Sequence, residues 1–436
     1  MLCTVPVSSL ISYNKFHAKA DGFIRFCLSQ KGMVIIMKHL FRNIFSLVFA
    51  IALCLSSSSF VFTAEAENSI AIEEHEVVSK VEEAIKLFYE NKDLGYSNDL
   101  GKILDKPILS LLGNKANIQQ YVSTLYKTSK ENYSVEIILL ENTKVDNQAH
   151  MKFQVITAFN YQNSHDVDTE VSEEVYVLYN YEKALITDFY TANNYYDMAV
   201  REQGSDTLLS PLISLTPDIE SKQQRLRNDI DRVYASQMLD GPANNNNNSL
   251  LRSSLNRSAI VSYARNNYSK QSPASGNGTV PYYDFSQISG NYDCTNFVSH
   301  ALLAGGANVY DTGGSGISST GWYYRNLSNR SSSWSGVNEL YKYLVNNTVS
   351  NYPSGISSMY SHHTGAWDTG YVMQFGNSSS SFSHSTIITK KDYSSDGDRA
   401  YALVTGRTSA TQNNNNQAAD DMFPNGYKRT IYVYNY

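Results

Sequence analysis

The chain has 436 residues, enough for two or three domains of ordinary size. Its formal net charge of −6 at pH 7 argues against a nucleic-acid partner, because proteins that bind nucleic acids usually concentrate positive charge. Tyrosine is abundant, with 33 residues, and tyrosine, serine and asparagine crowd the second half, a composition that favours strands and polar surfaces over long helices.

Residues 37–66 carry the features of an export signal. A short basic opening is followed by an apolar run over residues 44–55 and a small-x-small cleavage pattern at residues 64–66. We therefore expect a cleaved signal peptide and a secreted or cell-wall-associated protein, with residues 1–36 an extension or a mis-assigned start. The alternative is an uncleaved membrane anchor through residues 44–62.

Residues 67–202 predict an α+β domain that starts with a helix. Apolar residues recur at helical spacing over residues 73–89. Beyond Asn132 the pattern changes, and we expect strands over residues 135–140, 149–161 and 171–181. A helix followed by an antiparallel meander resembles the NTF2-like fold, although no motif carries that resemblance. The expected role is that of a spacer or recognition domain.

Residues 203–255 predict the joint between two domains. Residues 219–238 are rich in Arg, Gln and Asp and predict a charged surface helix. The asparagine run at residues 244–248 cannot bury a core, so we expect a flexible linker there.

Residues 256–436 predict a second α+β domain. We expect a helix over residues 256–267 and another that begins at Cys294, with Asp293 as its N-cap and a glycine pair as its stop. Strands are expected over residues 371–375, 383–389 and 401–405, in an antiparallel meander.

Cysteine usage points to Cys294. The other three cysteines, Cys3, Cys27 and Cys54, lie at or before the export signal, so the mature chain keeps one thiol and can form no internal disulfide. A lone thiol in an exported chain invites the interpretation of a nucleophile, and a small buried core residue is the alternative.

A cysteine in the first turn of a helix has the right surroundings for attack on a carbonyl. The helix N-terminus lowers a thiol pKa, so we expect the pKa of Cys294 to fall below about 8.5. The same backbone N–H groups can hold an oxyanion. His384, on the expected strand 383–389, can then serve as base and later as acid for the leaving amine.

Several short motifs in residues 256–408 resemble the putative amidase domain family of Gram-positive exported proteins, which is NlpC/P60- and CHAP-related and belongs to the papain-like superfamily. The matching pieces are Asn256-Arg257, Ala259, Tyr263-Ala264, Asp293-Cys294-Thr295-Asn296-Phe297-Val298-Ser299, Ala304-Gly305-Gly306, Trp322-Tyr323-Tyr324, Ser333-Trp334-Ser335 and His384-Ser385. The resemblance implies a papain-like α+β domain, with its cysteine at a helix N-terminus packed on an antiparallel sheet. It also implies a Cys/His hydrolase of amide bonds in peptidoglycan, with Cys294 as nucleophile and His384 as base.

Further residues are candidates for supporting roles. Thr405 is a candidate to orient His384, with Asp392 and Arg407 as other possible neighbours. Asp293, Thr295 and Asn296 are candidates for positioning or for the oxyanion site, although capping or packing would explain them equally well.

Aromatic residues are candidates for substrate binding. Trp322, Tyr323 and Trp334 could stack against a sugar, and core packing is the alternative. We expect no metal and no cofactor, because no histidine has convergent partners in the sequence. The pair Asp420-Asp421 is expected to be solvated.

The sequence therefore predicts an exported cysteine amidohydrolase that acts on peptidoglycan or a related peptide. Two alternatives remain open: a catalytically weakened papain-like domain that serves as a cell-wall binding or structural module, and a Cys/His acyltransferase that passes its thioester to an amine.

Overall fold

A computed structural model describes residues 74–90, 99–201, 218–239, 253–270, 285, 293–363, 367–393 and 399–436. Residues 78–436 form one compact unit. The expected signal peptide and the asparagine run of the expected linker lie outside the described residues. In the part of the chain that is described, no helix is long and apolar enough to cross a membrane.

The first part of the unit consists of helices followed by an antiparallel meander, as expected. A helix over residues 74–90 precedes η1 (Leu100–Lys102) and α3 (Lys106–Tyr126). The strands are β1 (Lys130–Val145), β2 (Gln148–Tyr161), β3 (Ser164–Asn180) and β4 (Leu185–Thr191), and they are followed by α4 (Tyr195–Val200) and α5 (Ile219–Gln237). The three expected strands and the expected helix at 219–238 are confirmed, with longer strands than the β-rich segments indicated.

The second part alternates helices with strands. It comprises β5 (Ser253–Ser254), α6 (Arg257–Asn267), α7 (Cys294–Ala304), a small sheet of β6 (Ile317–Ser318), β7 (Tyr324–Asn326) and β8 (Asn329–Ser331), then α8 (Ser332–Ser335) and α9 (Val337–Asn346). The remaining elements are β9 (Pro353–Met359), β10 (Val372–Gly376), β11 (Phe382–Tyr393), β12 (Ala400–Arg407), β13 (Asn413–Ala418), α10 (Ala419–Met422) and β14 (Tyr427–Asn435). The helices expected at 256–267 and from Cys294, and the three late strands, are confirmed.

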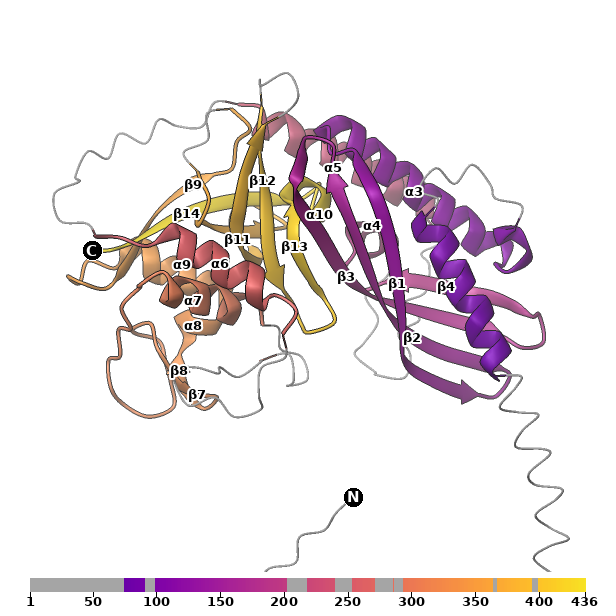
Figure 1. Ribbon diagram of the computed structural model, residues 1–436, viewed down its shortest axis with the longest axis horizontal. Coiled ribbons are helices and arrows are strands. Elements are labelled where there is room, and N and C mark those ends of the chain that lie inside the picture. Colours follow the sequence, from indigo (N-terminus) through magenta and orange to yellow (C-terminus); the bar gives the residue numbers. More distant parts are fainter. Residues whose placement is uncertain are drawn as a thin grey trace, which may run out of the picture. The chain divides into compact units, whose positions relative to one another are not determined.

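One large sheet joins the two parts. Its strand order is β1-β2-β3-β13-β12-β11-β10-β14-β5, with β4 also pairing with β3 and β9 also pairing with β14. The junction is the antiparallel pair β3–β13, where Asn413, Asn414 and Asn415 face Ser172, Val171 and Glu170. Figure 1 shows β13 of the second part beside β3 of the first. The chain is therefore a mixed α+β structure built on a large antiparallel sheet.

Two hydrophobic clusters cover the two faces of the second part of this sheet. On one face Val372, Ile387 and Ile431 pack with apolar residues of α6, α7 and α9. On the other face Met373, Phe375, Ile388 and Val404 pack with Tyr360, Trp367 and α10. Because successive strand residues point to opposite faces, this division tells which face each side chain of β10, β11 and β12 occupies.

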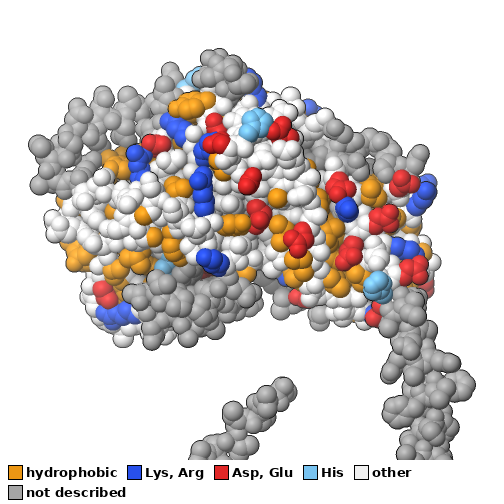
Figure 2. All heavy atoms as spheres, viewed as in Figure 1, with side chains coloured by type: hydrophobic (Ala, Val, Ile, Leu, Met, Phe, Trp, Pro, Cys, Tyr) orange, Lys and Arg blue, Asp and Glu red, His pale blue; other side chains and the backbone are white. Residues whose placement is uncertain are grey.

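Acidic and basic side chains are mixed on the face of the molecule shown in Figure 2.

The expectation that Asp420-Asp421 is solvated was wrong: Asp420 is 1% exposed, and the Asp421 side chain is 5% exposed and lies 2.9 Å from the Lys130 Nζ. The Asp420 residue is the more deeply buried of the two. Its carboxylate lies 3.1 Å from the buried Lys428 Nζ and 3.4 Å from the His362 Nε2. A charge that is taken out of water needs such partners, so this burial is explained by the pairing.

Candidate active site

Cys294 is the first residue of α7. The helix is held in place by Phe297, Val298, Ala301 and Leu302, whose side chains are fully buried in the cluster that faces β10 and β11. The Cys294 side chain is itself only 4% exposed. The helical spacing of these apolar residues thus fixes which face of α7 packs on the sheet.

Asp293 occupies the N-cap position, but its side chain does not cap the helix. Its Oδ2 instead lies 3.0 Å from the Arg407 Nε, and both side chains are fully buried. Its Oδ1 accepts hydrogen bonds from the Phe285 N–H at 3.0 Å and the Asn296 Nδ2 at 2.9 Å. The expectation of a side-chain cap was therefore wrong, because the carboxylate is needed to compensate a buried guanidinium.

A second backbone link ties this corner to the end of β12. The Asp293 N–H donates to the Thr408 carbonyl at 3.0 Å. Together with the Asp293–Arg407 ion pair, it holds the N-terminus of α7 against the end of strand β12. Arg407, considered from the sequence as a neighbour of His384, is thus a partner of Asp293.

The tryptophans of the family motifs are buried. The Trp334 Nε1 donates to the Asn296 Oδ1 at 2.7 Å, and the Trp322 Nε1 donates to the Ser299 Oγ at 3.1 Å. Trp322, Tyr323 and Trp334 are at most 1% exposed. The substrate-stacking role expected for them is contradicted, because a ring with no exposed face cannot stack on a sugar. Asn296 is engaged on both sides and is a positioning residue for this corner.

Thr295 links α7 to strand β11. Its Oγ1 lies 3.1 Å from the Ser385 Oγ, which also accepts from the Gln374 Nε2 at 3.1 Å. The Cys294 Sγ lies 3.8 Å from the Thr295 Oγ1, and the backbone of Ser385 is near enough to lower the pKa of the thiol in part. The thiol therefore lies at the residue that directly follows His384.

The imidazole of His384 points to the other face of the sheet. Ser385 points toward α7, so the alternation of strand side chains sends the neighbouring His384 to the opposite face. His384 faces Phe375 on β10, with ring centroids 6.2 Å apart. No hydrogen bond joins Cys294 and His384, and among the described residues the His384 Nε2 has no hydrogen-bond partner although it is buried.

The pairing of strands β11 and β12 stops before it reaches His384 on β11 and Arg407 on β12. The pairing of β11 with β12 ends at Ile387 and Thr405, short of the ends that carry His384 and Arg407. In this stretch Gly406 lies beside the imidazole: a Cβ at that position would be 3.5 Å from the His384 Nε2. The same Cβ would lie 2.6 Å from the Thr386 Cγ2, so it is the packing of Thr386 that requires a glycine here. Gly406 could not be recognised from the sequence because it interrupts no motif.

Burial sets the protonation states of both groups. It lowers the pKa of His384 to about 4, so the imidazole is neutral at pH 7 and can accept a proton. It raises the pKa of the Cys294 thiol, with smaller lowering contributions from Ser385 and Thr295. The expectation of a lowered pKa for Cys294 was wrong, because desolvation of a buried thiolate outweighs the helix N-terminus.

Thr405 does not orient His384. Its hydroxyl donates to the Asn415 Oδ1 at 3.0 Å, accepts from the Asn416 N–H at 3.0 Å and lies 3.2 Å from the Thr389 Oγ1. Asp392 is paired with Lys390 at 2.8 Å. Neither side chain is left to bind the imidazole.

His300 belongs to the core. His300 is 2% exposed, packs edge-on against Trp334 and stacks near Tyr263, and burial lowers its pKa to about 3. Within the described ranges, no group of three or more His, Cys, Asp or Glu side chains could hold a metal ion.

Residues 254–434 match the family model described as "Putative amidase domain". The C-terminal part of the chain is an amidase-like domain. In general terms the match indicates amide hydrolysis. Comparisons with curated proteins and with solved structures found no match.

The amidase-like domain shares a cavity with the meander that precedes it. This cavity has a volume of about 440 Å³, and His384 is one of its lining residues, as are Thr408 and Asn413 beside it. Cys294 is not among the lining residues. The imidazole of His384 therefore borders the cavity, whereas Cys294 lies on the face of the sheet that α7 covers.

Proposed function

We propose that the chain is an exported cysteine amidohydrolase that cleaves an amide bond in cell-wall peptidoglycan or a related peptide. The observation that carries the proposal is the position of Cys294, at the start of α7 and beside the backbone of the residue that follows His384, within the part that matches the amidase family. The arrangement of a cysteine at a helix N-terminus packed on an antiparallel sheet supports a papain-like mechanism. Residues 37–66 support export.

In the proposed reaction the Cys294 thiol and the His384 imidazole are both neutral at rest and become charged only while the sulfur attacks. For this step the His384 side chain must leave the face of the sheet that it occupies in the structure and reach the thiol. Its Nε2 then takes the Cys294 Sγ proton as the sulfur bonds to the amide carbon. The tetrahedral intermediate collapses, the C–N bond breaks, and the imidazolium returns the proton to the leaving amine. A water then attacks the thioester, with His384 again as base, and the C–S bond breaks to give a carboxylic acid and the thiol.

The start of α7 supplies donors for the oxyanion. The Phe297 N–H donates to the Asp293 carbonyl at 2.9 Å, which closes the first helical turn. The N–H groups of Cys294, Thr295 and Asn296 precede that bond and have no intrahelical acceptor. Such donors at a helix N-terminus stabilise the negative charge that develops on the carbonyl oxygen.

The Asp293–Arg407 pair supports this chemistry indirectly. It joins the residue before the nucleophile to the strand beside His384, with both side chains fully buried. We infer that it sets the position of the helix start relative to the gap between β11 and β12. Asp293 and Arg407 are thus proposed as positioning residues.

The experiment that tests the proposal measures new amino groups released from purified cell-wall peptidoglycan. The wild-type chain should release amines with a matching release of carboxyl groups, and Cys294→Ala should release none. His384→Gln should reduce the rate by a factor of about 10² to 10⁴, the usual contribution of general acid–base catalysis. Equal release by wild type and Cys294→Ala would exclude a cysteine mechanism.

One observation favours the weakened-catalyst alternative. The described residues provide no hydrogen bond between Cys294 and His384 and no group that orients the imidazole. Retained binding to peptidoglycan by a chain that releases no amines would support a binding module instead. Adding a primary amine during turnover separates the acyltransferase, because a transferase would form a new amide at the expense of the free acid.

A further inference from the structure

The cavity on the His384 side of the sheet is built by both parts of the unit. At about 440 Å³ it lies in the usual range for small-molecule sites. Its walls come from the helix at 74–90, α3, β1, β2, β3 and the turn before α4 on one side, and from β11, β13 and α10 on the other. The residues that bear on its chemistry are Tyr89, Gln119, Lys130, Glu173, His384 and Asn413.

Its charged residues leave one carboxylate without a cationic partner. The Lys130 Nζ lies 2.9 Å from the Asp421 Oδ2, so these two cavity residues neutralise each other. Glu173 has no ion pair among the described residues, and its Oε2 accepts one hydrogen bond, from the Tyr89 hydroxyl at 3.1 Å. A partly buried carboxylate of this kind attracts a cation.

Two further acceptors in the wall lack donors. The Asn413 Oδ1 is buried and has no hydrogen-bond partner in the described part of the chain, while its Nδ2 donates to the Ala410 carbonyl at 2.7 Å. This bond fixes the amide with its oxygen as the unmet group. The His384 Nε2 is likewise without a partner. Both atoms have almost no accessible surface, so they lie behind the cavity wall, and Glu173 is the charged group that a ligand in the cavity would meet.

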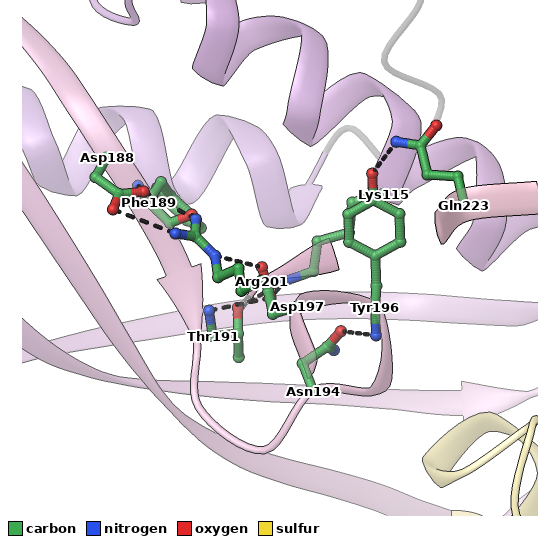
Figure 3. A network of polar contacts seen from close by, with 9 residues as sticks. All are labelled: Lys115, Asp188, Phe189, Thr191, Asn194, Tyr196, Asp197, Arg201 and Gln223. Atoms are coloured by element: carbon green, nitrogen blue, oxygen red, sulfur yellow. Dashed lines mark hydrogen bonds and ion pairs between the residues drawn. The ribbon is translucent and has the colours of Figure 1, made fainter. Parts of the chain in front are cut away.

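A network of hydrogen bonds supports the cavity wall at residues 192–195. Figure 3 shows the network behind it, in which the buried Lys115 donates to Asp197 and to the Thr191 Oγ1, the latter at 2.8 Å. The Asp197 Oδ2 also accepts from the Thr191 N–H at 3.1 Å. Asn194, a wall residue, accepts from the Tyr196 N–H at 3.0 Å and caps α4. A preformed wall lowers the ordering cost of binding.

We propose that this cavity binds a peptide-like ligand that carries one ammonium group, with the ammonium at the Glu173 carboxylate. The inference rests on the proposed function in one respect: the ligand would be a part of the substrate of the proposed hydrolase. In this account the meander before the amidase-like domain contributes to substrate specificity.

Two probes test the proposal on the full-length Cys294→Ala chain, which binds without turnover. They are N-acetyl-alanyl-lysine amide and the same peptide with an acetylated lysine side chain, compared by isothermal titration calorimetry. The lysine probe should bind about tenfold more tightly, the effect of one hydrogen bond to a charged group. Equal affinities, or no binding of either probe, would overturn the proposal, and this comparison needs no variant of the cavity itself.

Cavity variants locate the binding. Glu173→Gln should remove the tenfold preference, and the exposed Glu141→Gln on β1 should keep it. Gln119→Trp should fill the cavity and abolish binding of both probes, whereas Asn117→Trp, an exposed position on the same helix, should not. Unchanged binding in both cavity variants would place the ligand elsewhere. If the preference depends on Glu173 but no cysteine-dependent amine release occurs, the proposed function fails while the binding site stands.

Discussion

Removal of one partner of the buried Asp293–Arg407 ion pair should lower the free energy of unfolding by more than removal of one partner of an exposed pair. The perturbation is Asp293→Asn, which keeps the size of the side chain and removes its charge. The Arg407 guanidinium, fully buried and 3.0 Å from the carboxylate, would then lose the negative charge of Asp293. Breaking a buried ion pair by removing one partner costs about 3–5 kcal/mol.

This cost is large against the total stability of a folded protein, which is about 5–15 kcal/mol. For a cooperative unit of the size of residues 78–436, the unfolding entropy of about 2 cal/mol/K per residue corresponds to about 1.3 °C of melting temperature per kcal/mol. We therefore expect Asp293→Asn to lower the melting temperature by roughly 4–7 °C. Thermal unfolding followed by circular dichroism, with urea unfolding at 25 °C, gives both quantities.

A matched control separates burial from distance. Asp368 pairs with Arg257 at 2.6 Å, a shorter contact, but both side chains are 45% exposed. Asp368→Asn should cost about 0–1 kcal/mol, as exposed pairs do. The double change Asp293→Asn with Arg407→Met should recover part of the loss, since no unpaired charge remains buried. Equal costs for Asp293→Asn and Asp368→Asn would refute the reasoning.

Three further predictions concern the candidate site and the packing around it. The acid limb of kcat/KM should have its midpoint near pH 4 instead of 6.5, because burial disfavours protonation of His384; a pH profile with a midpoint above 6 would contradict this. Alkylation of Cys294 by iodoacetamide should be slow at pH 7 and should accelerate above pH 9, since burial raises the pKa of the thiol; a fast, pH-independent rate between pH 6 and 8 would show a preformed thiolate. Gly305→Ala should destabilise the chain by about 1–3 kcal/mol, because its Cβ would lie 2.4 Å from the Ile260 Cγ1, whereas Gly113→Ala, with open space around it, should not; urea unfolding of both variants checks the difference.

Local elements could be predicted from the sequence because their signals are local. The spacing of Phe297, Val298, Ala301 and Leu302 gave the helix α7 with its start at Cys294, and the β-rich segments gave β1, β2 and β3. The pairing of β3 with β13 could not be predicted in this way. It joins residues more than 200 positions apart, and no local pattern specifies such a partner.

The sequence offers candidate site residues, but it could not predict their contacts. Asp293 is a good N-cap by residue type, yet the fold brings it to a buried Arg407, and a charge out of water takes precedence over a helix cap. The sequence left open whether Trp322 and Trp334 lie in the core or on the surface, because aromatic rings occur in both places. Their indole N–H groups donate to Ser299 and Asn296, and these tertiary contacts place both rings in the core.

The pKa of Cys294 shows why position in a helix is insufficient evidence for reactivity. The sequence places the thiol in the first helical turn, where the dipole favours the thiolate. Whether the same thiol is desolvated depends on what packs over it, and here its side chain is only 4% exposed. Burial depends on tertiary packing, so the sequence pattern alone gave the wrong direction for the shift.

The central claim is that Cys294 attacks an amide carbon, and the most direct test is the covalent intermediate. The full-length chain is mixed with excess peptidoglycan fragments, quenched with acid during turnover, digested and mapped by mass spectrometry. We predict an acyl mass on the peptide that contains Cys294, removed by neutral hydroxylamine as a thioester would be and absent in Cys294→Ala. Amine release at an undiminished rate in Cys294→Ala, with no acylated Cys294 in the wild-type chain, would contradict the account.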